Sequence, residues 1–379
     1  MREQSSGKKI MKYFSPSRSV GLTGLAAVFI LASSQVVRAD SQHDMLVFLS
    51  AQQFKTFSAS DPALEDSDLG GTADFLYTFN SDNFRFLAEY IWTDTESEME
   101  RLQGAWVIDD NTTLWLGRFH AISNYWTTEY HHGQYMQTSI SRPGVEEWED
   151  ESGPMPSHIT GAWFEHQFSI KTQSAINLGL SAGIAPKFEG EELLAFDVLD
   201  PTSGHDLGVG TRIAYRPDLL STNQVGLTIA YNDIAVESES NPDLADLDAI
   251  SQVTIGLFTH WRWNEWVLSS NVMYFDIELQ YLSGDVNDEF ILGYVQAEYE
   301  ATEDWTLFSR IELGDGEDNS EYLQLLPAVI AHRHMLGVRW DFADSNALTI
   351  EIADTSTPTD NDDHDSFKEL RFQWSAVFP

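Results

Sequence analysis

The sequence predicts an all-β fold, a transmembrane antiparallel β-barrel of about 16 strands with one long loop, the third on the extracellular side. Three observations predict it. From Leu46 onward polar and apolar residues alternate with a period of two, the period of a strand, and the helical period of 3.6 is nearly absent. The connections alternate between short turns and longer acidic loops. One loop, at 120–158, is much longer than the others, and loops of that length are usually functional.

The first segment reads as a secretory signal peptide. Basic residues such as Arg2 and Lys12 precede an apolar run at 20–32, and Val37-Arg38-Ala39 forms a small-residue cleavage site. The apolar run is too short to span a bilayer, for which a helix needs about 20 apolar residues. We therefore expect a signal peptide at 1–39 and one barrel domain at 40–379.

The amino-acid composition limits which classes of partner the protein can bind. The chain has no cysteine, so an exported barrel would use no disulfide framework. Residues 40–379 include 15 basic and 59 acidic side chains. Because phosphate binding depends on Lys and Arg, this balance argues against a nucleic-acid partner. We expect the acidity to reflect mainly a solvated surface, such as one suited to a salty habitat.

Sixteen segments carry the strand pattern. The last one sets Leu370, Phe372 and Trp374 against Arg371 and Gln373. The predicted strands lie at 44–57, 70–80, 83–94, 98–109, 112–120, 158–168, 173–183, 205–216, 223–235, 248–262, 265–277, 288–301, 304–314, 329–342, 345–354 and 366–378.

The lengths of the connections support a barrel in a membrane. Short turns at 81–83, 109–111, 171–172, 264–265, 302–304 and 343–346 alternate with longer loops, apart from a short connection at 95–97. Outer-membrane barrels have short periplasmic turns and longer extracellular loops, and closure pairs every backbone group in lipid. A soluble β-sandwich or propeller would show the same alternation along its strands, but it would not predict this asymmetry of loops.

Two stretches then carry a resemblance to a known family. The terminal strand of alternating aromatics, ending at Phe378 before Pro379, resembles the assembly signal of Gram-negative outer-membrane barrels. The run Leu116-Gly117-Arg118-Phe119, with Tyr125-Trp126 and His131-His132-Gly133, is similar to porins of the phosphate-selective type and their uncharacterised relatives. Sixteen strands with a long third loop look like the trimeric porins, and this resemblance implies that the long third extracellular loop folds into the lumen.

The resemblance implies a function and partners. It implies an outer-membrane porin, a passive diffusion channel for ions and small hydrophilic solutes, with no enzymatic activity. It also implies a homotrimer in contact with lipopolysaccharide and outer-membrane lipids. Small residues on the outward face, such as Gly104 and Ser270, would suit packing against another subunit.

Most arginines fall on the polar face of the strands and so are expected in the lumen. We expect a pore constriction in which luminal arginines face the acidic third loop and sort ions by the field between them. Its predicted residues are Arg118, Arg212, Arg262, Arg310, Arg339, Glu129, Glu146, Glu147, Trp126, His131 and His132. Alternatively, the arginines pair with inward carboxylates such as Glu89, Glu312 and Glu369 and fill a small barrel. Scarce lysines and acidic rims argue against phosphate selectivity.

Aromatic residues on the other face are expected to form girdles at the two membrane interfaces. They are Phe84, Trp106, Trp115, Phe119, Tyr215, Tyr231, Trp305, Trp340, Trp374 and Phe378.

We expect no cofactor and no bound metal. His131 and His132 are adjacent, so their side chains point apart, and His332 and His334 are expected to pack at the interface. The acidic run that begins at Asp315 lacks the glycine and final glutamate of an EF-hand. A looser role, bridging divalent cations to lipopolysaccharide phosphates, stays open for that run.

Two other function classes remain as alternatives. His131, His132, Ser139 and Ser141, with Glu129 near, are the parts of a hydrolase site, but no G-x-S-x-G elbow occurs. A structural barrel, an adhesin or a sheath around a periplasmic partner, would share the fold. Ion conduction by the isolated protein separates this alternative from a channel.

Overall fold

The computed structural model describes residues 42–379 except 96, 131–132, 200, 202–203, 238–243, 327–328 and 360–362. The strands of its barrel are β1 (Gln42–Phe57), β2 (Ser67–Asn80), β3 (Phe84–Thr93), β4 (Ser97–Asp109), β5 (Thr112–His120), β6 (His158–Lys171), β7 (Ser174–Ile184), β10 (Leu207–Arg216), β11 (Gln224–Glu237), β12 (Leu247–Trp263), β13 (Trp266–Tyr281), β14 (Val286–Glu300), β15 (Trp305–Asp315), β16 (His332–Ala343), β17 (Asn346–Thr359) and β18 (Asp363–Phe378).

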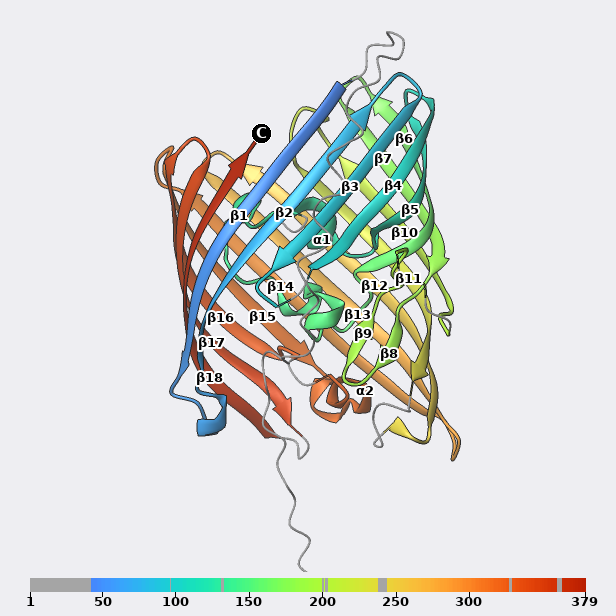
Figure 1. Ribbon diagram of the computed structural model, residues 1–379, viewed down its shortest axis with the longest axis vertical. Helices are drawn as coiled ribbons and strands as arrows, with labels where there is room; N and C mark the ends of the chain where they lie inside the picture. The colour runs from blue at the N-terminus through green and yellow to red at the C-terminus, as the bar shows by residue number, and fades with distance from the viewer. Residues whose placement is uncertain are drawn as a thin grey trace, which may run out of the picture.

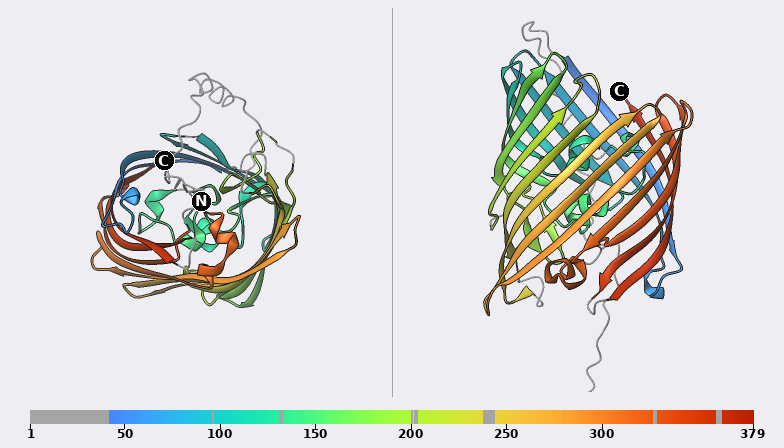
Figure 2. Two further views of the ribbon diagram at one scale, coloured as in Figure 1. Left: turned by 90° about the horizontal axis from the view of Figure 1, so that it is seen from below. Right: turned by 180° about the vertical axis from the view of Figure 1, so that it is seen from behind.

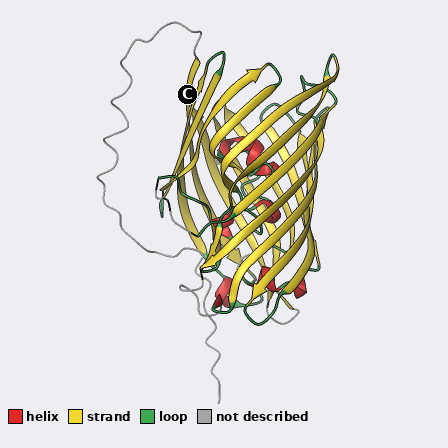
Figure 3. Cartoon of the chain, turned by 90° about the vertical axis from the view of Figure 1, so that its right-hand side faces the viewer, coloured by secondary structure: helices red, strands yellow, loops and turns green. Residues whose placement is uncertain are grey.

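These strands form a closed antiparallel ring of sixteen (Figures 1 and 2). Each pairs with its neighbours in sequence, and β1 pairs with β18 from Val47 opposite Phe378 to Phe57 opposite Lys368. β7 pairs directly with β10, and the short hairpin of β8 (Lys187–Glu189) and β9 (Glu192–Leu194) is attached to the ring by parallel pairing of β8 with β11. The strands cross the height of the molecule at a common tilt (Figure 3).

The predicted sixteen-stranded antiparallel barrel is confirmed, and the largest differences in bounds have a physical cause. β17 continues to Thr359 and β18 begins at Asp363, although polar residues there predicted a loop from 355. Thr355 and Thr357 are buried in this extension, where they alternate with more exposed residues. A strand that extends beyond an apolar band keeps its pairing but loses the apolar alternation by which a sequence reveals it.

The outer surface of the ring is apolar. On β11, Val225, Leu227 and Ile229 are exposed, whereas Thr228 between them is buried. The same alternation recurs on β15, where Ile311 is exposed and its two neighbours are buried. An apolar outer band with polar residues facing inward is the pattern of a membrane barrel.

The predicted aromatic girdles need a correction on β5. Phe84, Trp106, Tyr215, Tyr231, Trp305, Trp340 and Phe378 are exposed as expected. Phe119 is fully buried, however, and Trp115 donates a hydrogen bond to Glu165 at 2.6 Å. Between them Gly117 has a φ of 130°, and a Cβ there would lie 2.1 Å from the carbonyl oxygen of Leu102. Trp115 and Phe119 are four residues apart and share one face of the strand, whereas Leu116 is 57% exposed, so the outward face of β5 is the one that carries Leu116.

A large apolar cluster joins the 121–157 segment to one side of the barrel. It includes Trp126, Val145 and Met155 of that segment, Phe275 of β13, and Tyr322 of α2 (Glu321–Gln324). Among the described residues, no helix is long and apolar enough to cross a membrane.

Candidate functional site: the 121–157 segment and the barrel wall

The 121–157 segment is built from short helical turns. They are α1 (Tyr125–Tyr130), η2 (Gln134–Met136), η3 (Gly144–Glu146) and η4 (Glu149–Glu151). Asn124 precedes α1, and its side-chain oxygen accepts a hydrogen bond from the Thr127 N–H at 2.9 Å, as an N-cap residue does. Pro143 precedes η3 with a φ of -64°. The local sequence therefore supplies a side-chain cap for α1 and a proline of fixed φ before η3.

Arg310 of β15 is the main cationic anchor for this segment. Its guanidinium is fully buried and donates to Ser139 Oγ at 3.1 Å, to the Ser141 carbonyl at 3.0 Å and to the Arg142 carbonyl at 2.8 Å. It also pairs with Glu312 on its own strand at 2.7 Å. Because Arg presents five donors in a rigid fork, one side chain can fix several carbonyl groups of a loop.

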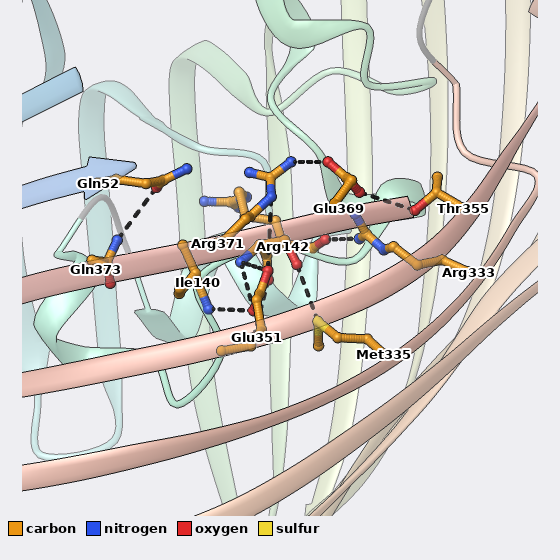
Figure 4. A network of polar contacts seen from close by, with 12 residues as sticks. Gln52, Ile140, Arg142, Arg333, Met335, Glu351, Thr355, Glu369, Arg371 and Gln373 are labelled. Atoms are coloured by element: carbon orange, nitrogen blue, oxygen red, sulfur yellow. Dashed lines mark hydrogen bonds and ion pairs between the residues drawn. The ribbon is translucent and has the colours of Figure 1, made fainter. Parts of the chain in front are cut away.

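Two buried carboxylates anchor the same stretch by its backbone. Glu351 of β17 accepts hydrogen bonds from the N–H groups of Ile140, at 2.8 Å, and Ser141, at 3.1 Å (Figure 4). Glu312 accepts one from Gly144 N–H at 2.7 Å. Hydrogen bonds to an ionised acceptor are roughly twice as strong as neutral ones. The segment is thus bound to β15 and β17 through its main chain.

Contacts on the opposite side of the barrel are more open. Arg212 of β10 donates to Thr128 Oγ1 at 2.8 Å and pairs with Glu129 at 3.0 Å. Its guanidinium carbon lies 4.7 Å from the ring centroid of Phe258, against which Tyr125 stacks at 4.8 Å. The Glu129 side chain remains partly exposed, so this ion pair is accessible to solvent.

Trp126 and Glu146 form the interior of the segment. Trp126 is fully buried, with its ring centroid 4.6 Å from Tyr130 and 5.9 Å from Tyr294. Glu146 accepts hydrogen bonds from the Trp126 N–H and from Asn271 Nδ2. Burial raises the pKa of Glu146, although these two hydrogen bonds act in the opposite direction. Trp126 and Glu146 therefore hold the segment together, and they contact β14 through Tyr294 and β13 through Asn271, respectively.

The other predicted site residues lie as follows. Arg118 is buried, pairs with Glu98 and donates to the Glu100 carbonyl at 2.9 Å. Arg262 pairs with Glu300 at 2.6 Å. In both cases the ion-pair partner is a strand carboxylate and not an acid of the long loop, since Glu98 lies on β4 and Glu300 on β14.

Arg339 contacts the long segment, and Glu147 forms an ion pair within it. Arg339 pairs with Asp341 at 2.7 Å and also donates to the Tyr135 carbonyl at 2.7 Å. Glu147 pairs with Arg142 of its own segment at 3.7 Å. His131 and His132 lie outside the described residues. The structure therefore brings Arg212, Arg310 and Arg339 to the long segment.

Sequence reasoning missed Arg142, which organises the segment from within. Its guanidinium carbon lies 3.6 Å from the centroid of the Trp148 ring, and it donates to Thr127 Oγ1 at 2.7 Å and the Glu146 carbonyl at 3.2 Å. A signal was available, since Arg142 is the one Lys or Arg between 121 and 157. A lone cation among six acids is a natural internal partner for them.

Comparisons with known proteins bear on the fold. A scan against protein-family models and a search of curated proteins find no match. Among solved structures, the anion-selective porin from Comamonas acidovorans matches with a TM-score of 0.63 and 12% identity, over 89% of this chain and 100% of that one. The fold is that of the porins.

Two further porin-fold structures agree. The Salmonella typhi OmpF complex with daunomycin matches with a TM-score of 0.56 and 11% identity, over 89% of this chain and 97% of that one. The outer membrane channel DcaP of Acinetobacter baumannii matches with a TM-score of 0.55 and 9% identity, over 89% and 97%. With so little identity, the likeness is one of fold.

Proposed function

We propose that this protein is an outer-membrane porin, a passive diffusion channel for ions and small hydrophilic solutes. The observation that carries the proposal is a closed ring of sixteen strands with an exposed apolar outer face and a charged inner one. Closure satisfies the backbone hydrogen bonds that lipid cannot. The matched structures, one described as an outer membrane channel, support the same use of the fold.

The third long loop, at 121–157, serves in this proposal as a constriction folded into the lumen. Its support is the set of hydrogen bonds from Ile140, Ser141 and Gly144 to buried residues of β15 and β17. These contacts leave little space on that side, where Arg310 is 0% exposed. We infer that solutes pass on the opposite side, along β10 and β12.

The ion pairs along that passage have the exposure such a role requires. Arg212 with Glu129, and Arg262 with Glu300, are more exposed than Arg310 with Glu312, and the Arg262 side chain is 47% exposed. Each exposed pair places opposite charges across a short distance. A transverse field of that kind orients polar solutes and sorts ions.

Electrical recording tests the proposal. The purified protein in a planar bilayer should give stepwise conductance, and liposomes that contain it should swell in small sugars but not in large ones. A folded barrel, shown by different gel migration of heated and unheated samples, that passed no ions would contradict the proposal. That result would favour a structural barrel around a periplasmic partner.

The oligomeric state stays a prediction. Gly104 of β4 and Ser270 of β13 were expected to mark a subunit interface, and they share a face with the exposed Trp106 and Leu268, respectively. The two strands are seven places apart in the ring of sixteen, so these residues lie on nearly opposite sides. They cannot both face the axis of one homotrimer. Light scattering after mild extraction should decide between trimer and monomer.

A further inference from the structure

Three segments that are distant in sequence meet at the rim opposite the short turns. η6 (Glu317–Asn319) follows the end of β15, His332 is the first residue of β16, and His364 lies next to the start of β18. One ligand atom from each of Glu317, His332 and His364 lies within 4.8 Å of the other two.

The individual contacts show how these side chains are aimed. His332 Nε2 lies 3.2 Å from a carboxylate oxygen of Glu317, and His364 Nε2 lies 3.0 Å from Asp318 Oδ1. The two imidazole rings have centroids 5.5 Å apart. Glu317 is buried, while both histidines are partly exposed, so a solute can reach the imidazoles from the rim. The cluster therefore has a fixed carboxylate and two accessible imidazole side chains.

This donor set fits one class of ion. Imidazole nitrogen suits Zn²⁺ and other divalent transition metals, whereas Ca²⁺ and Mg²⁺ prefer oxygen ligands. Two histidines with one carboxylate are a known set of zinc ligands, and the fourth position is then taken by water or a further group. Asp318 is close enough to supply that group or to hold a histidine by its second nitrogen.

The distances are also compatible with closure around an ion. Ligands of a tetrahedral zinc ion, at about 2.1 Å from the metal, lie about 3.4 Å from one another. The three ligand atoms here span at most 4.8 Å. The difference of somewhat over 1 Å falls within what side-chain rotation of two partly exposed histidines provides, without movement of the strands.

We propose that Glu317, His332 and His364 form a binding site for a divalent transition-metal ion of the Zn²⁺ class. The bound ion joins β16, β18 and the connection that follows β15 at this rim. This goes beyond passive diffusion and does not depend on it, because the site uses no residue of the proposed passage. A barrel that conducts no ions would leave this proposal standing.

The test uses the full mature chain without an affinity tag, purified in detergent and treated with a chelator. Zn²⁺ alone is titrated by calorimetry, and Co²⁺ is used as a spectroscopic probe of tetrahedral coordination. The variants are His332→Gln and His364→Gln. His334→Gln is the matched control, since His334 is exposed on the same strand two residues away.

We expect one Zn²⁺ per chain in the wild type and in H334Q, with affinity at least about tenfold weaker in H332Q and in H364Q. Zn²⁺ should raise the thermal transition temperature of the wild type and H334Q, and not that of H332Q or H364Q. Excess Mg²⁺ should not displace the bound Zn²⁺. Glu317→Gln gives a further measurement in case a histidine variant fails to fold. Saturable binding that is equal in all folded variants, or no saturable binding in the wild type, would overturn the proposal.

Discussion

Removing the Glu351 carboxylate should release the 139–144 stretch from the wall. In Glu351→Ala, the N–H groups of Ile140 and Ser141, bound at 2.8 and 3.1 Å, lose their acceptor in a buried place. Hydrogen bonds to charged groups contribute about 1.5–3 kcal/mol each. Water entering the vacated space restores part of this, so we expect a net loss of about 2–3 kcal/mol in the free energy of attachment.

Since about 1.4 kcal/mol is a factor of ten, the detached population should rise roughly 30- to 140-fold. Hydrogen exchange of the 139–144 amides should speed up by a similar factor, and single-channel recordings should show more open-channel noise. Glu369→Ala is the matched control. Glu369 is similarly buried, but it bonds Thr355 at 2.9 Å and Arg371 at 2.6 Å on the strands. Unchanged exchange in Glu351→Ala, or an equal change in both variants, would refute the reasoning.

Four further outcomes are expected. Deleting residues 127–151 should raise single-channel conductance and admit larger sugars, and unchanged values would contradict the constriction. Neutralising Arg212 and Arg262 together should shift the reversal potential toward cation selectivity. The wild type should prefer cations weakly at low salt and lose that preference as salt rises past 0.1 M, where the Debye length is about 10 Å. Strong anion selectivity of the wild type at low salt would count against the expected cation preference. Because burial raises the pKa of Glu146 in the folded state, ionisation opposes folding. Its cost is absent below the ordinary pKa of about 4.3 and grows as pH rises through the folded value. Melting of Glu146→Gln should therefore be less sensitive to pH than that of the wild type, and parallel pH profiles would exclude the effect.

The barrel could be predicted from sequence because its signal is local. Alternation is written into each strand, as at Val225, Leu227 and Ile229, and the turns lie between strands that pair with their neighbours. On β5 the wrong face was taken as the outer one, because Trp115 and Phe119 are as apolar as Leu116, which is the exposed residue. It also passed over the β8–β9 hairpin, whose three-residue strands are too short to show a period.

The candidate site was harder to predict because its contacts are not local. Arg310 could be placed in the lumen by its face of β15, but nothing in the sequence says that it binds the carbonyls of Ser141 and Arg142. The rim cluster shows the same limit. His332 was considered with His334, its neighbour in sequence, whereas the fold places it beside His364 and Glu317. Pairings of this kind depend on which ends of the strands meet.

The pairing of β1 with β18 also determines how the molecule must be made. β1 must wait for β18, because Val47 pairs with Phe378, which comes much later in the sequence. Until then two rows of backbone donors and acceptors have no counterpart, and lipid offers them none. Insertion strand by strand would leave these edges in hydrocarbon at every stage. Completion of the ring and entry into the bilayer are therefore coupled, and loss of the last few residues should prevent assembly rather than yield a smaller barrel.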